Sequence, residues 1–393
     1  MLMDNDAVIV AACRTAVGKY AGTLAPCRDY QLGGLVIKEA VKRAGLTGKE
    51  EVIDDIYFGN LLGVPGNVAR VAALEAGIPD CVPAVTVDRQ CASGLEAVSI
   101  AAAMIKSGMG EIYVAGGCES MSNRPYYLDK PTKAYQPAPP TFLGNMFTPP
   151  DGFEQLGMGD TAENILDEYD ISRQELDEYS LISHKKAVRA ISDGAFQSQI
   201  VPVMVKTRKD CICFDKDEGP RVDTNLEQLA KLRPLFRTDG KVTAGNSCPM
   251  NDGASAVIVM SRKKAMELGC TIMCSIKAIA AVGVDYRKMG LGPIFAVRKL
   301  LSKSGITIDD IGLIELNEAF ASQTIACIEE LNLRQEIVNV NGGAIALGHP
   351  LAATGTILLT KLIYEMKNRN VDLGLVTMCI GGGQGMAMVI ENQ

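Results

Sequence analysis

The sequence repeats one order of predicted elements in its two halves, and this repeat limits the possible folds more than any single motif does. In the first half a strand candidate at residues 84–87 ends at Cys91, and a helix, a strand and two glycines follow. In the second half a strand candidate at residues 337–340 leads to a break that carries His349, and a helix, a strand and three glycines follow. Duplicated α/β halves that pack together bring corresponding breaks toward one interface. We therefore expect Cys91 and His349 to face one pocket.

Alternating strand and helix patterns extend this repeat, with one interruption. Apolar runs predict buried strands, and runs with helical spacing such as residues 29–44 predict the helices that cover them. Residues 124–153 are rich in proline and aromatic residues and predict loops, and two charged helices are predicted at 160–169 and 172–192. The predicted boundaries are 1–120 for the N-terminal α/β half, 121–249 for an inserted loop domain, 250–272 for the rest of the N-terminal half and 273–393 for the C-terminal α/β half.

Composition favours a soluble globular protein over a nucleic-acid-binding or membrane protein. Of the 393 residues 47% are hydrophobic and 22% are charged, and the formal net charge is −7. An acidic chain lacks the basic surface that nucleic acids require, and no apolar run approaches the roughly 18 residues of a membrane span. Because no secretory pattern precedes the first strand, we expect a cytoplasmic protein. The twelve cysteines are scattered without zinc-ligand spacing, so we expect reduced thiols and no metal site.

Two histidines and one cysteine are the first candidates for chemistry. His184 lies in the polar helical run S-L-I-S-H-K-K, which predicts a solvated surface side chain. His349 lies in the glycine-rich run N-G-G-A-I-A-L-G-H-P, which makes it the candidate acid or base. Cys91 stands at the start of a predicted helix, where free N–H groups and the helix dipole lower the pKa of a thiol. The alternative for Cys91 is a buried, inert cysteine.

Seven short motifs occur in a fixed order along the chain. They are V-D-R-Q-C-A-S-G at 87–94, A-G-G-C-E-S-M-S at 115–122, M-G-D-T-A-E-N at 158–164, A-K-L-R-P at 230–234, N-E-A-F-A at 317–321, N-G-G-A-I-A-L-G-H-P at 341–350 and C-I-G-G-G-Q-G at 379–385. With these motifs the chain resembles the thiolases over essentially its whole length. Thiolases are acyltransferases that make or break 3-oxoacyl thioesters of coenzyme A. The resemblance implies an α/β thiolase fold, with two duplicated βαβ-type halves in α/β/α/β/α layers and an inserted loop domain.

The resemblance implies a role for each of five residues. Cys91 would be the nucleophile that carries the acyl group, His349 the base beside it, and Cys379 the acid/base at the reacting carbon. Asn317 would hold a water that, with His349, faces the enolate oxygen. The N–H groups of Cys91 and Gly381 would face the oxygen of the tetrahedral adduct. Taken alone, Asn317 could instead cap a helix that N-E-A-F opens, and Cys379 could be a core cysteine.

The resemblance also implies contacts with coenzyme A, mostly in the inserted region. Arg221 falls where a family arginine contacts the nucleotide. Gln228 and Cys248 occupy the positions of two family serines, and the thiol of Cys248 is a weaker hydrogen-bonding group than a hydroxyl. Met289 matches a methionine that lines the acyl pocket of short-chain members. Phe320, in the N-E-A-F-A motif, completes the predicted substrate contacts.

Two further departures from the family pattern concern the acyl group. Gly157 stands where short-chain members place a histidine, which predicts room for acyl groups longer than acetoacetyl, whereas Met289 favours short ones. Ala352 and Thr354 replace a glycine and a serine after His349, and their added methyl groups are expected to narrow the start of the following helix.

The resemblance implies a reversible Claisen condensation through an acyl-Cys91 intermediate. The substrates would be two acetyl-CoA molecules, or a 3-ketoacyl-CoA with coenzyme A in the reverse direction. Coenzyme A would be substrate and product, so no separate cofactor is expected. We expect a homo-oligomer, either a dimer or a homotetramer, with no nucleic-acid or membrane partner. The alternatives are a non-catalytic acyl-CoA- or lipid-binding protein of the same fold and a decarboxylating ketosynthase-type condensing enzyme, against which Cys379 argues.

Overall fold

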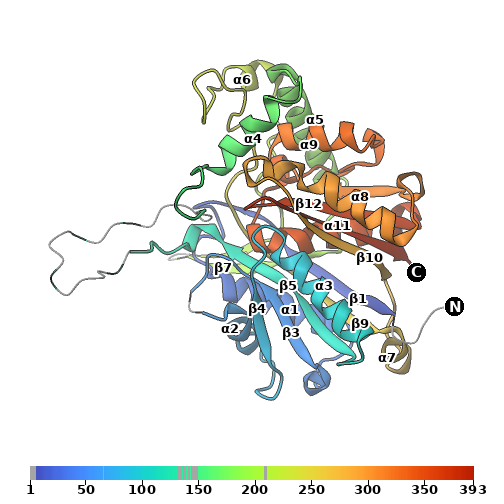
Figure 1. The fold of residues 1–393 in the computed structure, drawn as a ribbon. Coiled ribbons are helices and arrows are strands. Elements are labelled where there is room, and N and C mark those ends of the chain that lie inside the picture. Colours follow the sequence, from blue (N-terminus) through green and yellow to red (C-terminus); the bar gives the residue numbers. More distant parts are fainter. Residues whose placement is uncertain are drawn as a thin grey trace.

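The computed structural model describes residues 6–64, 66–128, 130, 135, 139, 142, 149–207 and 210–393, and it shows one order of elements twice (Figure 1). The first half contains β1 (Ala7–Thr15), β2 (Gly18–Lys19), α1 (Asp29–Arg43), β3 (Asp55–Gly59), α2 (Val68–Glu75), β4 (Ala84–Val87), α3 (Ser93–Lys106), β5 (Ile112–Ser120), β9 (Asn251–Ser261) and α7 (Arg262–Glu267). The second half contains β10 (Cys274–Gly283), η3 (Tyr286–Leu291), α8 (Gly292–Ser304), β11 (Leu313–Leu316), α9 (Ala321–Glu330), η5 (Gln335–Ile337), α10 (Ala344–Leu347), α11 (Leu351–Arg369), β12 (Leu373–Ile380) and β13 (Gln384–Asn392). The inserted region between β5 and β9 contains α4 (Met158–Leu166), α5 (Arg173–Ser192), β6 (Ile200–Val201), β7 (Val203–Lys206), β8 (Cys211–Phe214) and α6 (Leu226–Ala230).

The strands of the two halves follow the same spatial order. The first half has the order β1–β9–β5–β3–β4, and the second has β10–β13–β12–β11. In each half the last strand, β9 or β13, pairs antiparallel with both neighbours, whereas β3–β4, β3–β5 and β11–β12 are parallel. The two sheets meet where β1 and β10 pair antiparallel, Val8 with Ser275 and Ile9 with Cys274. The sheet topology thus contains the duplication that the sequence predicts.

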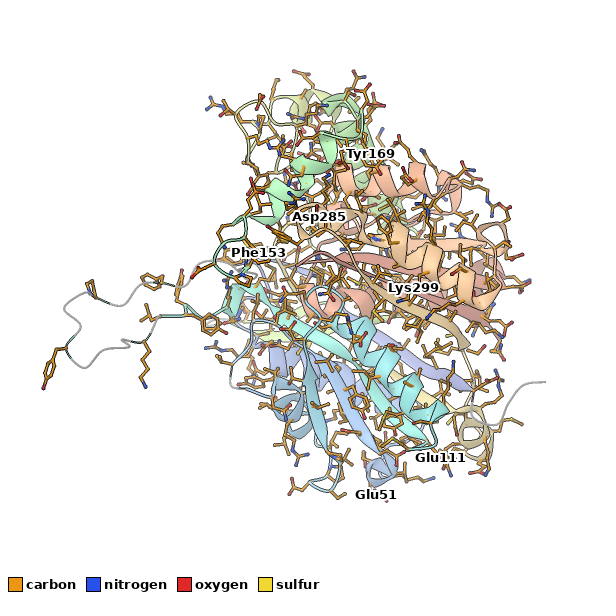
Figure 2. The ribbon with its side chains drawn as sticks, in the orientation of Figure 1. Glu51, Glu111, Phe153, Tyr169, Asp285 and Lys299 are labelled. Atoms are coloured by element: carbon orange, nitrogen blue, oxygen red, sulfur yellow. The ribbon has the colours of Figure 1, made fainter. Side chains whose placement is uncertain are left out.

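The helices form three layers around the two sheets. In the middle layer α3 and α11 pack against each other, and Leu95, Val98 and Leu359 share one buried apolar cluster with side chains of both sheets. Helices α1 and α2 cover the outer face of the first sheet, and α8 and α9 cover the outer face of the second. Side chains fill the space between these layers (Figure 2). The predicted α/β/α/β/α arrangement is confirmed.

Two glycines allow the central helices to approach closely. A Cβ atom at Gly94 in α3 would lie 2.6 Å from the carbonyl oxygen of Ala352 in α11. A Cβ atom at Gly355 in α11 would lie 2.6 Å from the Cβ atom of Leu95 in α3. Such distances are well inside van der Waals contact, so each position accepts only a glycine without a shift of the helices. The crossing holds the start of α3, which follows Cys91, against the start of α11, which follows His349.

The prediction of a strand at residues 337–340 is wrong. The structure reduces it to a single parallel bridge between Ile314 and Val338, because Asn339 has a φ of 44° and leaves the extended conformation. The amide side chain of Asn339 replaces the ladder: its Oδ1 accepts the N–H of Leu316 at 2.9 Å, and its Nδ2 donates to the Leu316 carbonyl at 2.8 Å. Residue 338 therefore occupies the position that β4 holds in the first half.

The described part of the insertion packs on both halves: its helices α4 and α5 lie on the second half, and β6 pairs with β1 of the first half. Helix α4 lies on α9, and α5 lies on α9 and α10 (Figure 1). The second predicted charged helix is confirmed as α5, and the hydroxyl of Ser172 caps it by accepting the N–H of Glu175 at 3.2 Å. Most of the loop predicted at residues 124–153 lies outside the described residues. Among the helices of the described chain, none has the length and apolar character to span a membrane.

A buried ion pair attaches the end of the insertion to the first sheet. The guanidinium of Arg14, in β1, binds the carboxylate of Asp217 through two contacts at 2.7 and 2.9 Å, and both side chains are almost fully buried. Asp217 also accepts the main-chain N–H of Val17 at 2.8 Å. The paired charges satisfy each other, so the segment that precedes Arg221 is fixed on the end of β1.

Candidate active site

Cys91 lies in a tight turn between β4 and α3, as the sequence predicts. Gln90 has a φ of 47°, which is unusual for a residue other than glycine. Its N–H donates to Asp88 at 2.8 Å, and its carbonyl accepts the hydroxyl of Ser93 at 2.6 Å. The same hydroxyl accepts the N–H of Arg89 at 2.9 Å. These bonds hold the turn in its uncommon conformation and fix where the Cys91 thiol points.

The surroundings of Cys91 raise the pKa of its thiol, whereas the sequence predicts a lowered pKa. Desolvation raises the pKa of the Cys91 thiol to about 11, although hydrogen bonds from the N–H groups of Gly381 and of Cys91 itself lower it. The prediction of a lowered pKa was wrong because loss of hydration outweighs the helix end. At neutral pH the thiol is protonated, so it needs a base before it can act as a nucleophile. The two N–H groups that contact its sulfur are those predicted to face an adduct oxygen.

His349 is a buried, neutral imidazole with one open nitrogen. The main-chain N–H of His349 donates to Asn251 Oδ1 at 2.9 Å, and the ring atom Nδ1 lies 2.6 Å from the hydroxyl of Thr354. That hydroxyl donates to the carbonyl of Pro350 at 3.0 Å, so it accepts from Nδ1–H and the free lone pair is on Nε2. Nε2 is buried and has no hydrogen-bond partner in the described part of the chain. Burial lowers the pKa of His349 to about 4, so the ring is an unprotonated base at neutral pH.

Three thiols from different parts of the chain lie within electrostatic range of one another. Cys379, at the end of β12, is buried. Burial is the main cause that raises its pKa well above the usual range, and electrostatic interactions with the thiols of Cys91, Cys327 and Cys248 raise it further. Burial, and to a smaller extent the interaction with Cys91, raises the pKa of the Cys248 thiol to about 12. The structure therefore brings Cys379 close to Cys91, as the family resemblance implies, and adds the Cys248 thiol to them.

Asn317 has a fully buried side-chain amide that finds no hydrogen-bond partner among the described residues. Both its Oδ1 and its Nδ2 are unpaired, although its main-chain N–H donates to the carbonyl of Thr377 at 3.0 Å. The alternative of a helix cap is wrong, because α9 begins at Ala321 and Phe320 precedes it as the N-cap. Burying an unpaired polar group costs about 1–3 kcal/mol, so this amide is arranged for a ligand rather than for stability.

Several predicted substrate residues form an apolar wall beside Cys379. Met289 and Phe320 are buried in one cluster with Cys379, and Met158 and Cys248 pack against it. Gly157 comes directly before Met158 as the N-cap of α4, and a Cβ atom there would meet only Asp160 Oδ2, at 3.1 Å. The missing side chain of Gly157 therefore borders α4 rather than the thiol of Cys379.

Arg221 and Gln228 lie in the insertion and are not part of the apolar cluster beside Cys379. Gln228 is exposed on α6. Arg221 lines a hollow of about 340 Å³ on the side of α5, together with His184, Lys185 and Arg189. The prediction that His184 is solvated was wrong: it is buried, and its Nδ1 accepts the N–H of Arg221 at 3.2 Å. Burial and the Arg221 charge lower the pKa of His184 to about 4.

Sequence reasoning missed the buried carboxylate of Glu119. It accepts the N–H groups of Leu62 at 3.1 Å, of Leu61 at 3.3 Å and of Ala352 at 3.3 Å, and so links the end of β5 to the first turn of α11. Burial raises the pKa of Glu119 to about 8. A charged residue in the apolar run A-G-G-C-E-S was the available signal. In the part of the chain that the structure describes, no group of His, Cys, Asp or Glu side chains is placed to hold a metal ion.

Duplicated α/β halves that bring a cysteine of one half close to a cysteine of the other, with a buried imidazole whose Nε2 is open in the second half, are features of one class of acyltransferases. The family model described as the thiolase N-terminal domain matches residues 7–263, and the thiolase C-terminal domain matches residues 270–392. The chain belongs to the thiolase family.

Its relatives match it from end to end. It is 48% identical to the acetyl-CoA acetyltransferase of Syntrophomonas wolfei, covering 99% of this chain and 100% of that protein. It is 44% identical to the 3-ketoacyl-CoA thiolase of Bacillus subtilis, and the match covers 98% of this chain and 99% of that protein. It is also similar to the crystal structure of the Bacillus anthracis acetyl-CoA acetyltransferase, with a TM-score of 0.93, 41% identity and 99% of each chain covered. Relatives with both names thus have comparable similarity to this chain.

Proposed function

We propose that this thiolase joins two acetyl-CoA molecules into acetoacetyl-CoA and coenzyme A, and that in reverse it cleaves 3-ketoacyl-CoA with coenzyme A. One observation carries the proposal: the thiols of Cys91 and Cys379, from opposite halves, lie within electrostatic range of each other. A thiol that carries an acyl group and a second thiol that moves a proton are the two groups a Claisen reaction on thioesters needs. The names of the relatives agree with this chemistry.

In the first step of the proposed mechanism, Nε2 of His349 accepts the proton of the Cys91 thiol. The thiolate attacks the thioester carbonyl, and a bond forms between the Cys91 sulfur and the acyl carbon. The adduct oxygen is held by the N–H groups of Cys91 and Gly381, which contact the thiol sulfur in the structure. When the adduct collapses, the bond to the sulfur of coenzyme A breaks, and that sulfur takes the proton from His349.

In the second step Nε2 of His349 takes the proton of the Cys379 thiol, and the resulting thiolate removes a proton from the methyl group of a second acetyl-CoA. The enolate carbon attacks the acyl carbon on Cys91, and the new carbon–carbon bond forms as the bond from that carbon to the Cys91 sulfur breaks. The Cys91 sulfur takes the proton from His349, and Cys379 keeps the methyl proton, so all three groups return to their starting state. The enolate oxygen is stabilised by a water on the otherwise unpaired amide of Asn317 and by His349. These steps use only groups of the chain and its substrates, so the proposal includes no separate cofactor.

The proposed site for coenzyme A extends from the thiols into the insertion. Cys248, Met289 and Phe320 are placed along the acyl group and the pantetheine arm, which their packing beside Cys379 supports. Arg221 and Gln228 are placed along the nucleotide end. Gly157 is assigned to acyl groups longer than acetoacetyl, and thiolysis of 3-oxoacyl-CoA substrates from four carbons upward tests this assignment. A sharp preference for the four-carbon substrate would contradict it.

Replacing Cys91 by alanine tests the reaction. We expect Cys91→Ala to abolish both thiolysis and the transfer of radiolabelled acetyl groups from acetyl-CoA to the protein. The matched control is Cys211→Ser, which changes an exposed thiol on β8 and should keep both activities. Undiminished thiolysis in Cys91→Ala would refute the acyl-Cys91 intermediate.

We also propose a cytoplasmic homo-oligomer, a dimer or a tetramer. Strand β4 ends the sheet, and the Val85 side chain on it is 44% exposed. Exposed aromatic residues gather near the insertion, where Tyr126 and Phe142 are in edge-to-face contact. An exposed edge strand and exposed apolar side chains favour association with further copies. Light scattering after gel filtration measures the state, and a monomer at micromolar concentration would contradict the proposal.

A further inference from the structure

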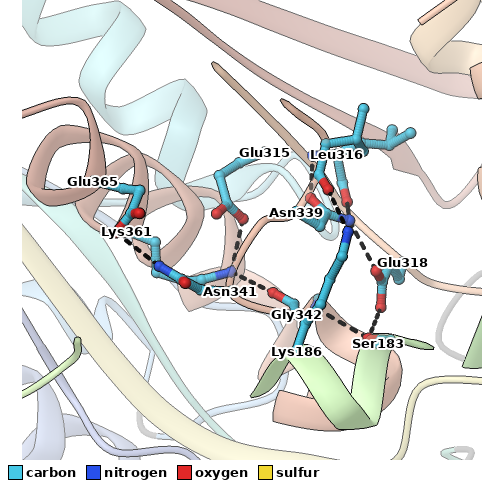
Figure 3. Close-up of polar contacts among 12 residues, drawn as sticks. Ser183, Lys186, Glu315, Leu316, Glu318, Asn339, Asn341, Gly342, Lys361 and Glu365 are labelled. Atoms are coloured by element: carbon cyan, nitrogen blue, oxygen red, sulfur yellow. Dashed lines mark hydrogen bonds and ion pairs between the residues drawn. The ribbon is translucent and has the colours of Figure 1, made fainter. Parts of the chain in front are cut away.

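A buried carboxylate directly after Asn317 connects three segments of the chain. Glu318 is 1% exposed and accepts four hydrogen bonds. Figure 3 shows it between two of the donors, Ser183 and Asn339. Two come from α5 of the insertion, from the hydroxyl of Tyr179 at 3.0 Å and that of Ser183 at 2.7 Å. The other two come from the second half. The Nδ2 atom of Asn339 donates at 2.9 Å, and the N–H of Ile345 in α10 donates at 3.2 Å.

Neutral donors, rather than a cation, satisfy this carboxylate. Glu315, three positions earlier, is paired with Lys361 at 2.7 Å, but in the described structure Glu318 takes part in no ion pair. Burial and the Glu318 carboxylate raise the pKa of Tyr179 well above its usual value, so Tyr179 remains a protonated donor. A buried charge without a cation is costly unless donors surround it, so its retention beside the candidate site indicates a use.

The space around Glu318 is closed. A Cβ atom at Gly343 would lie 2.1 Å from the carboxyl carbon of Glu318, so only a glycine fits there. The N–H of Gly343 donates to the hydroxyl of Ser183 at 3.1 Å, which orients that hydroxyl toward the carboxylate. The side chain of Glu318 therefore has one position, and its main chain is fixed with it.

Among the described residues, no hydrogen bond orients the side-chain amide of Asn317. Its direction therefore depends on the position of the main chain at residues 317 and 318. His349, in contrast, is held at its main-chain N–H by Asn251 and at its ring by Thr354. A change at Glu318 should thus move Asn317 while leaving the base of Cys91 in place.

We infer that Glu318 is a positioning residue that holds Asn317 for the carbon–carbon step. The inference rests on the roles proposed above for Asn317 and Cys91. It predicts a selective defect, because acyl transfer between coenzyme A and Cys91 does not use Asn317, whereas cleavage of the carbon–carbon bond does. A misplacement of about 1 Å in a catalytic group can cost about 100-fold in rate.

The test compares two reactions of the same variant. Glu318→Gln puts an NH₂ group among four donors, and we expect acetoacetyl-CoA thiolysis to fall about 10-fold to 100-fold in kcat. Exchange of labelled coenzyme A into acetyl-CoA, which reports only acyl transfer to Cys91, should stay within about 3-fold of wild type. Tyr179→Phe and Ser183→Ala each remove one donor and should show smaller losses with the same selectivity. They decide the question if Glu318→Gln does not fold.

The matched control is Asn341→Ala. Asn341 donates to Glu365 at 2.8 Å in the same region and does not contact Glu318 (Figure 3). We expect it to keep both rates. Equal losses of exchange and thiolysis in the Glu318 and Ser183 variants, or no loss in either, would overturn the inference. If the wild-type protein itself lacks exchange and thiolysis, the proposed function fails instead.

Discussion

At His349 one hydroxyl group decides which ring nitrogen carries the proton. The hydroxyl of Thr354 gives its own proton to Pro350 and so accepts from Nδ1, which leaves the Nε2 lone pair free. Without this acceptor either tautomer could form, and Nε2–H would be unable to take a proton from Cys91. The sequence showed the position of His349 but not its tautomer, because the tautomer depends on the direction of a neighbouring hydroxyl.

Replacing Thr354 by valine should remove this control with little change in shape. We expect thiolysis by Thr354→Val to fall about 10-fold to 100-fold, as is typical when a group that orients a catalytic histidine is lost. Thr354→Ser keeps the hydroxyl and should stay within about 2-fold of wild type. Steady-state thiolysis and the rate at which iodoacetamide alkylates Cys91 measure the effect. Wild-type rates in the valine variant would show that Thr354 does not set the tautomer.

Between the helices, the crossing of α3 and α11 depends on the absence of two side chains. Gly94 and Gly355 each lie where a methyl group would overlap the opposite helix. The small-residue character of the first helix is visible in the sequence. Which of its glycines faces another helix is not visible, because that depends on how the two halves rotate against each other.

Gly355→Ala should therefore destabilise the protein and disturb the site. A methyl group there meets the main chain and Cβ atom of Leu95, and we expect the free energy of unfolding to fall by about 1–3 kcal/mol. Denaturant unfolding measures this loss. Gly283→Ala is the control, because a Cβ atom at Gly283 meets nothing within 4 Å, and it should change stability by less than about 0.5 kcal/mol. Equal stability of the two variants would contradict a tight crossing.

Across the chain as a whole, the repeat predicted the architecture, and long-range contacts decided the rest. The order of elements was enough to place Cys91 near the second half, and the family motifs added Asn317 and Cys379. The prediction of a strand at 337–340 was wrong because the side chain of Asn339 replaces main-chain hydrogen bonds. An apolar sequence pattern does not reveal such a replacement. The prediction of a solvated His184 was wrong because this side chain is buried on α5 and accepts the main-chain N–H of Arg221, which comes from a distant segment.

The insertion should depend on the buried pair of Arg14 and Asp217. Asp217→Ala leaves the guanidinium buried without its counter-charge, and we expect a loss of about 3–5 kcal/mol in stability together with faster proteolysis in the insertion. The exposed pair of Lys231 and Glu227 is the control, and Glu227→Gln should cost less than about 1 kcal/mol. Denaturant unfolding and limited trypsin digestion separate the two. A loss as small as that of the control would mean that the pair does not hold the insertion.

The two ends of the joined sheet differ in what they can accept. At one end β4 is an exposed strand, whereas at the other end Val338 lies beside β11 and Asn339 occupies the hydrogen-bonding groups of Leu316. A subunit with two open edges can add copies without limit and form fibres, but a subunit with one open edge can only pair. The side chain of one asparagine thus closes one end of the sheet and leaves β4 as the end at which strand could add to strand.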